Sequence, residues 1–230
     1  MRHKRHHQPE SGFSLVEMAI VLAIVALLLA GLLPTLSSQI EQQRRNETRK
    51  QLEDIQQALI GYAIINGTLP CPSTQADPAN ANYGLADATC SASPAAEGYL
   101  PWKTLGVAET DAWGEKRNSA SSAWIGYWRY RTDRNFSNSG TPFTLTTGFS
   151  TDALVIRDNS GNSMTSTTER PVAIVYSTGN NLAADGQNTG FEATGGIYQS
   201  DTPSTSFDDV LIWVSRPQLF NRMVAAGKLP

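Results

Sequence analysis

The stretch SGFSLVEMAI (residues 11–20) opens a run of apolar residues that continues almost unbroken to Leu33. At about 1.5 Å per residue, a helix from Phe13 to Leu33 is long enough to cross about 30 Å of hydrocarbon. One acid, Glu17, lies inside this run. A carboxylate near a helix centre in lipid costs about 2.5–3.5 kcal/mol, and such acids usually have a specific partner. We therefore expect a transmembrane helix at 13–33 whose single acid has a role of its own.

The first seven residues, MRHKRHH, are strongly basic and contain all three histidines of the chain. By the positive-inside rule, this head should stay in the cytoplasm while the bulk of the chain lies across the membrane. If the head is removed, no histidine is left for acid–base catalysis or metal binding downstream. The net charge of −3 gives no indication of a nucleic-acid partner.

Gly12 directly precedes the apolar run. A cut after Gly12 would expose the α-amine of Phe13, a cation four residues before Glu17. These two charges can pair within one chain, or between neighbouring copies in a stack of parallel helices. In surroundings as apolar as lipid, such a pair is strongly directional.

The order Gly12-Phe13-Ser14-Leu15-Val16-Glu17, followed by a long apolar helix, resembles the prepilin motif of type IV pilins and type II secretion pseudopilins. This resemblance covers about residues 8–66. Three later segments are more weakly similar to segments of pseudopilins: DAWG (111–114), YSTGNNLAADG (176–186) and FDDVLIW (207–213).

The resemblance implies a role for each motif residue. A prepilin peptidase would cleave between Gly12 and Phe13 and the new N-terminus at Phe13 would be methylated. Glu17 would guide docking into a growing filament, and Pro34 would kink the helix. The implied partners are the peptidase/methyltransferase, an inner-membrane assembly platform, membrane lipid before assembly, and copies of this chain or other pilins in a helical filament.

Cys71 and Cys90 are the two cysteines of the chain, and both follow the apolar run. An even number of cysteines beyond a membrane span favours one disulfide in an oxidising compartment. Two free, buried thiols are the alternative.

The remaining pattern predicts an α+β fold. The long N-terminal helix should end at Asn66, before Gly67 and two prolines, and pack its second half against an antiparallel sheet. A short C-terminal helix should begin after Ser215 as N-cap, with either Leu219 and Met223 or Phe220 and Val224 facing inward. Apolar and β-branched runs predict strands at 123–131, 143–147, 153–157, 172–177 and 209–214. The expected parts are a cleaved leader (1–12), the helix (13–66) and a periplasmic or extracellular globular domain (67–230).

Asp208 and Asp209, together with Asp185, are candidate ligands of a structural calcium ion, because hard oxygen ligands gather here near a glycine-rich loop. The resemblance to pseudopilins that carry calcium in this loop supports the site, and a solvated turn is the alternative. No other cofactor is expected.

These patterns predict a structural subunit of a type IV pilus-like filament rather than an enzyme. Its precursor would cross the inner membrane once, with the globular domain in the periplasm, before joining a pilus or pseudopilus. A pseudopilin of a type II secretion system is the first alternative. A membrane-tethered periplasmic binding domain or enzyme is the second.

Overall fold

The computed structural model describes residues 14–90, 97–118, 124–137, 141–190 and 196–229. The chain forms two compact units, residues 1–43 and 44–230. Helix α1 (Leu15–Asn66) begins in the first unit and ends in the second.

The end of α1 lies where the sequence predicts it. The helix stops at Asn66, and the N–H of Gly67 donates a hydrogen bond to the carbonyl oxygen of Ala63 at 2.8 Å. Pro34 lies within α1, and the kink predicted there stays a prediction. The leader 1–12 and Phe13 lie outside the described residues.

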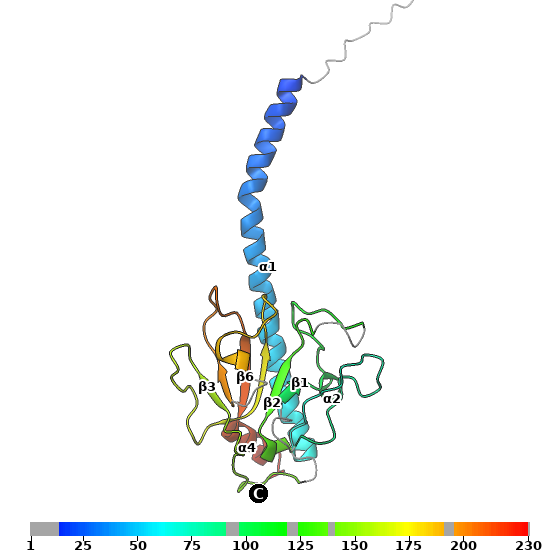
Figure 1. Cartoon of the computed structure of the whole chain (residues 1–230), viewed down its shortest axis with the longest axis vertical. Helices are drawn as coiled ribbons and strands as arrows, with labels where there is room; N and C mark the ends of the chain where they lie inside the picture. Colours follow the sequence, from blue (N-terminus) through cyan, green and yellow to red (C-terminus); the bar gives the residue numbers. More distant parts are fainter. Residues whose placement is uncertain (1–13, 91–96, 119–123, 138–140, 191–195, 230) are drawn as a thin grey trace, which may run out of the picture. The chain divides into compact units, whose positions relative to one another are not determined.

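A four-stranded antiparallel sheet forms the centre of the second unit (Figure 1). Its order is β1-β2-β4-β6, with β1 at Glu97–Tyr99, β2 at Arg129–Thr132, β4 at Pro171–Ser177 and β6 at Val210–Ser215. Every residue of β4 is buried, as expected for a continuous apolar run that is covered on both faces. This arrangement confirms the predicted combination of a long helix and an antiparallel sheet.

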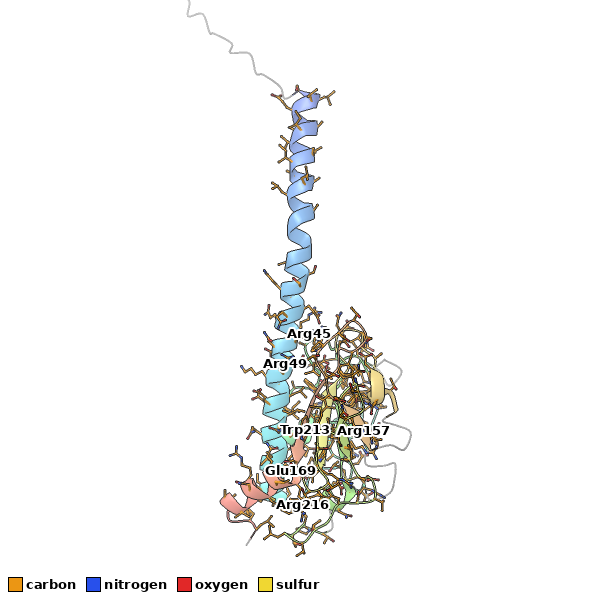
Figure 2. All side chains as sticks on the ribbon, turned by 90° about the vertical axis from the view of Figure 1, so that its left-hand side faces the viewer. Arg45, Arg49, Arg157, Glu169, Trp213 and Arg216 are labelled. Carbon is orange, nitrogen blue, oxygen red and sulfur yellow. A yellow bond between two sulfur atoms is a disulfide. The ribbon has the colours of Figure 1, made fainter. Side chains whose placement is uncertain are left out.

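The two faces of β4 belong to two different cores. Val175 packs in one cluster with Leu59 of α1, and Tyr176 packs in the other with Ile156 and Tyr198. Gln56 of α1 also donates a hydrogen bond through Nε2 to the carbonyl oxygen of Trp213, at 2.7 Å. Figure 2 shows Trp213 on β6, beside the second half of α1. The second half of α1 therefore covers one face of the sheet, and a smaller sheet covers the other. The buried α1 residues of the first core are Leu52, Ile55, Leu59, Ile60 and Ala63.

The smaller sheet corrects the prediction that all strands are antiparallel. Strand β3 (Val155–Arg157) pairs in parallel with β5 (Ile197–Gln199). The sequence predicts a strand at 153–157 but none at the positions of β5 or β1. Each of those two strands has only three residues, so pairing with a distant strand stabilises it more than its own composition does.

Two predicted strands are wrong in part or in full. Residues 143–147 form a turn, in which the N–H of Thr144 donates to the hydroxyl of Thr147 at 2.8 Å. Such side-chain bonds compete with strand pairing, although threonine is β-branched. In the segment predicted at 123–131, the strand begins only at Arg129, because Trp124 and Tyr127 pack edge to face in an aromatic cluster.

The C-terminal helix α4 (Arg216–Ala225) is confirmed together with its cap. The hydroxyl of Ser215 accepts a hydrogen bond from the N–H of Gln218 at 3.3 Å. Leu219 and Met223 are the pair that faces inward, since both are buried. Three short helices complete the described part of the chain: α2 (Trp102–Leu105), α3 (Arg134–Ser137) and the 3-10 helix η1 (Gly186–Gly190).

The predicted disulfide between Cys71 and Cys90 is present. Both cysteines are buried, and their sulfur atoms lie 3.4 and 3.5 Å from the carbonyl oxygen of Ser137. The bridge therefore closes the loop after α1 against α3.

Candidate functional site

Ser14 and Glu17 are joined by two reciprocal hydrogen bonds at the start of α1. The N–H of Glu17 donates to Oγ of Ser14 at 3.2 Å, and the N–H of Ser14 donates to Oε2 of Glu17 at 2.9 Å. This arrangement is a capping box, which satisfies N–H groups that the first helical turn leaves unpaired. The carboxylate of Glu17 thus has a partner within its own chain.

Sequence reasoning missed this role of Ser14, although its signal is present. A serine followed three residues later by a glutamate, before an apolar run, marks a helix start. The partner predicted for Glu17 was the α-amine of Phe13. Phe13 and Gly12 lie outside the described residues, so that pairing and the cleavage site stay predictions.

The first two turns and the middle of the N-terminal apolar run are exposed. The exposed fraction is 91% for Leu15, 76% for Leu27 and 61% for Leu28. Large apolar side chains in such a row are unusual on the surface of a soluble protein and mark an interaction surface. Within the first unit, α1 therefore presents a surface that suits a partner or an apolar environment.

Three carboxylates meet beside the start of β6. Asp208 and Asp209 directly precede this strand, and Asp185 lies in the loop after β4, just before η1. One oxygen atom of each carboxylate lies within 4.8 Å of the others. The structure thus brings together all three acids that the sequence predicts as calcium ligands, and we call them the acid cluster.

Backbone N–H groups hold the acid cluster in place. Oδ2 of Asp208 accepts hydrogen bonds from the N–H groups of Asn180 and Asn181, at 2.8 and 3.0 Å. Oδ2 of Asp209 accepts from the N–H of Asp185 at 2.9 Å, and Oδ2 of Asp185 accepts from the N–H of Asp208 at 2.8 Å. Each acid is therefore fixed by the segment that carries the others.

The other oxygen atoms of the two central acids are buried without partners. Among the described residues, Oδ1 of Asp208 and Oδ1 of Asp209 have no hydrogen-bond donor, and the two residues are only 8% and 4% exposed. Burial raises the pKa of Asp209 to about 7, and the nearby charges of Asp185 and Asp208 raise it further. Burial also raises the pKa of Asp208. Buried, unpartnered carboxylate oxygens suit a hard cation such as Ca²⁺, so the donor set fits this ion.

Asn188 supports the acid cluster and was missed from the sequence. Its Nδ2 donates to Oδ2 of Asp209 at 2.8 Å and to the carbonyl oxygen of Gln199 at 3.1 Å, while its Oδ1 accepts from the N–H of Gln199 at 2.7 Å. The side chain is fully buried and links β5 to the cluster. Several asparagines share this loop, and nothing in their spacing distinguishes Asn188.

Gly179 allows the loop to approach the acid cluster closely. Its φ is +62°, and a Cβ atom there would lie 2.6 Å from the carbonyl oxygen of Asp208. Its N–H donates to Oγ of Ser177 at 3.0 Å, and the Ser177 hydroxyl in turn donates to the buried carboxylate of Asp111. The segment 111–114 and the glycine-rich loop are thus connected through Ser177.

Comparison with known proteins identifies the N-terminal segment. Residues 8–33 match the family model described as the prokaryotic N-terminal methylation motif. The chain carries the prepilin-type motif of type IV pilins and pseudopilins. The match includes Ser14 and Glu17 and ends within α1. No curated protein and no solved structure matches the chain.

The prepilin-type motif indicates a structural, pilin-like protein that is made as a membrane-anchored precursor. Among the described residues, no helix is apolar over enough of its length to cross a membrane. The span predicted at 13–33 is therefore not confirmed.

Proposed function

We propose that this chain is a structural subunit of a type IV pilus-like filament. The match of residues 8–33 to the N-terminal methylation motif is the observation that carries the proposal. In this proposal, a prepilin peptidase cleaves the precursor between Gly12 and Phe13 and methylates Phe13. An inner-membrane assembly platform then transfers the subunit from the lipid into the filament, with the globular domain outside the cytoplasm.

The start of α1 supports this proposal physically. The capping bond of Glu17 to Ser14 is exposed, and such caps contribute only about 1 kcal/mol. An α-amine from a neighbouring copy, placed in apolar surroundings, offers the carboxylate a stronger partner than an N–H group. Glu17 can therefore exchange its internal partner for an intermolecular one at little cost.

Two other functions share parts of this pattern. A type II secretion pseudopilin would use the same N-terminus, and the similarity of the DAWG and FDDVLIW segments to pseudopilin segments favours it as the second candidate. A membrane-tethered binding domain or enzyme would keep residues 1–12 attached.

Mass spectrometry of the chain extracted from its host distinguishes the filament subunit from the tethered domain. We expect the loss of residues 1–12 and the gain of one methyl group on Phe13. In a host that lacks the prepilin peptidase, the chain should keep its leader. A mature chain that still begins at Met1 would refute the proposal.

Replacement of the motif acid tests assembly. Glu17→Gln should abolish recovery of the subunit in sedimented filaments, because an amide carries no charge for the neighbouring amine. Glu53→Gln is the matched control, since Glu53 is an exposed acid on the same helix, and it should assemble as wild type does. Equal sedimentation of both variants would contradict the assigned role of Glu17.

We also propose that the acid cluster binds one structural Ca²⁺ through Asp185, Asp208 and Asp209. The two buried oxygen atoms without donors support this proposal. The ion would neutralise the concentrated charge and fix the loop 180–188 against β6. Isothermal titration calorimetry of the full chain with CaCl₂ should give one site, and the Asp208→Asn variant should lose it.

A further inference from the structure

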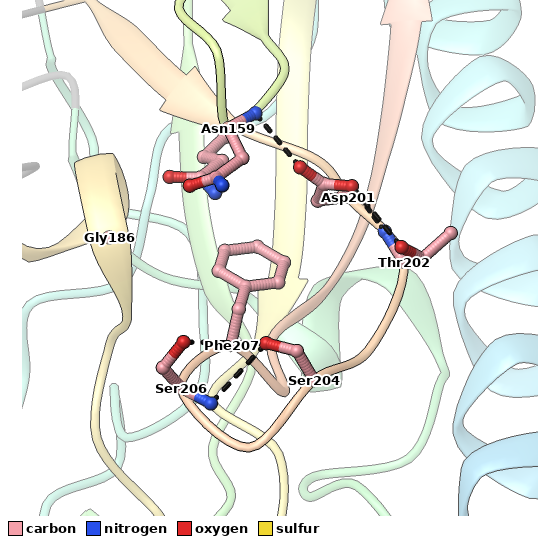
Figure 3. A pocket seen from close by; sticks show the side chains of 8 residues that line it. Asn159, Gly186, Asp201, Thr202, Ser204, Ser206 and Phe207 are labelled. Atoms are coloured by element: carbon pink, nitrogen blue, oxygen red, sulfur yellow. Dashed lines mark hydrogen bonds between the residues drawn. The ribbon is translucent and has the colours of Figure 1, made fainter.

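A pocket lies next to the acid cluster, and the three carboxylates of that cluster are not among the residues that line it. It has a volume of about 300 Å³ and is formed by the turn at Asn159, by Gly186, and by the segment from Gln199 to Phe207 (Figure 3). Gly186 follows Asp185 and Phe207 precedes Asp208, so the pocket and the acid cluster share these two chain segments. We call this space the polar pocket.

The charges around the polar pocket exclude strongly charged ligands. Among the described residues that line it, none is basic, so a phosphate or carboxylate ligand finds no counter-ion. Asp201 is the one acid. Its Oδ2 accepts a hydrogen bond from the N–H of Asn159 at 2.8 Å, and its Oδ1 accepts from the N–H of Thr202 at 2.7 Å. Both oxygens of this carboxylate accept hydrogen bonds, and no second acid among the described lining residues is present to complete a cation site.

The remaining polar groups can both donate and accept hydrogen bonds. They are the hydroxyls of Thr202, Ser204 and Ser206 and the side-chain amides of Asn159 and Gln199. Ligand hydroxyl groups have the same double capacity, so a ligand with several hydroxyls can satisfy this lining. An apolar ligand would leave these groups without partners, which costs free energy.

Gln199 gives the most specific indication of a ligand. The residue is only 3% exposed, and its Oε1 accepts a hydrogen bond from the N–H of Gln187 at 3.1 Å. Its Nε2 has no hydrogen-bond acceptor among the described residues, although the side chain lines the polar pocket. The amide is thus fixed at one end and unpartnered at the other. This amide nitrogen is not among the fully buried atoms without a partner, so it is open to the polar pocket and can donate a hydrogen bond to a molecule bound there.

Phe207 supplies the apolar part of the polar pocket. Figure 3 shows its ring between Asn159 on one side and Ser206 on the other. The ring is 5% exposed and therefore forms the floor of the pocket. A ring beside hydroxyl and amide groups matches a sugar, which has a face of C–H bonds and a rim of hydroxyls.

We propose that the polar pocket binds a neutral saccharide, with the amides of Gln199 and Asn159 bonded to sugar hydroxyls and Phe207 below the sugar ring. Its volume suits one or two sugar rings. This proposal is independent of filament assembly, because every residue that carries it belongs to the unit 44–230.

Saturation-transfer difference NMR on the full chain tests the proposal. The chain is held in a zwitterionic detergent, because a maltoside headgroup would compete for the pocket. The probes are glucose, galactose, mannose, N-acetylglucosamine and N-acetylgalactosamine. We expect at least one of them to receive saturation with a dissociation constant of about 1 mM, the weak end of specific binding.

Two variants locate the binding. Gln199→Met keeps the length of the side chain and the backbone bonds to Asn188, while Asn159→Ala removes an amide whose side chain makes no bond to another described residue. Each should weaken binding about tenfold, the loss expected for one hydrogen bond. Gln57→Ala removes an exposed amide from α1 and should have no effect.

Two results would overturn the proposal. One is the absence of saturation transfer to all five sugars. The other is a signal that Asn159→Ala leaves unchanged, which would place the sugar elsewhere; this variant decides the matter even if Gln199→Met does not fold.

Discussion

Asp209→Asn should make the calcium-free chain more stable at pH 8. In the wild-type chain, burial raises the pKa of Asp209 from the ordinary value of 3.8 to about 7. The protonated form is therefore favoured in the folded state, and folding is opposed once the group must ionise. Stability from this group is complete below about pH 4 and is lost as the pH rises to about 7. The amide of asparagine never ionises, so the variant avoids this loss.

The size of the effect follows from the shift. A difference of about three pKa units corresponds to about 4 kcal/mol, which is the upper limit because loop movement and water entry reduce it. Asparagine keeps one oxygen that can accept from the N–H of Asp185 and from Asn188. In wild type, Oδ1 of Asp209 has no donor among the described residues. In the variant an NH₂ group takes the place of this oxygen and can donate to a neighbouring carboxylate. Little of the gain should therefore be lost to poorer hydrogen bonding.

Calcium should narrow the difference in stability between the two chains. Wild type gains about 2.7 kcal/mol when calcium exceeds its dissociation constant 100-fold, whereas the variant has lost a ligand. The assay is thermal unfolding of the full chain, followed by near-ultraviolet circular dichroism at pH 4.5 and pH 8, with EDTA or with calcium. For a domain of this size, each kcal/mol corresponds to about 2–4 °C.

The design includes two controls. Asp111 is also buried, with its pKa raised to about 6, but it is present in both chains and cancels in the comparison. Asp54→Asn changes an exposed acid on α1 and should leave the melting temperature unaltered. An Asp209→Asn chain that melts below wild type in EDTA at pH 8 would refute the reasoning.

Two further predictions concern the loops of the second unit. Joint replacement of Cys71 and Cys90 by alanine should lower the free energy of unfolding in urea by about 3 kcal/mol, and an unchanged midpoint would contradict a stabilising role of the bridge. Gly179→Ala should weaken calcium binding in calorimetry, because the new Cβ collides with Asp208. Gly148→Ala, where the same atom meets open space, should bind calcium as wild type does.

Local signals in the sequence were sufficient to predict where α1 ends and where α4 begins. Asn66 is followed by glycine and prolines, and Ser215 stands three residues before Gln218. Each boundary is therefore determined by residues close to it in the sequence. The choice between Leu219 and Phe220 as the inward residue could not be made this way. It depends on how α4 packs against distant strands.

Strands β1 and β5 could not be predicted, because their stability comes from non-local pairing. Glu97–Tyr99 pairs with β2, and Ile197–Gln199 pairs with β3, which lies about 40 residues earlier in the chain. In contrast, residues 143–147 have the composition of a strand, but threonine hydroxyls bond to the backbone and form a turn. Composition alone does not decide between these outcomes.

The acid cluster shows the same limit at the level of a site. Asp185 and Asp208 are separated by 23 residues in the sequence and are joined by a hydrogen bond in the fold. The nearby glycine-rich loop and the resemblance to a family suggested that they meet, but neither could give the geometry. Asn188 and Gln199 carried no signal, because a buried amide is recognised only by what surrounds it. The fold decides which of several asparagines becomes part of a site.

Glu17 and Asp209 are both carboxylates whose hydrogen bonds within the described chain are weak or incomplete. Within the described residues, Glu17 has an exposed capping bond of about 1 kcal/mol, and Asp209 has one oxygen with no donor at all. The buried carboxylate of Asp209 is therefore incompletely compensated when it is ionised, whereas the exposed carboxylate of Glu17 would be so only in apolar surroundings. A partner stronger than the cap would therefore stabilise Glu17 in apolar surroundings, and either a proton or a cation would relieve Asp209. We infer that a second copy completes Glu17 and a cation completes Asp209, so that assembly and ion binding finish what folding leaves open.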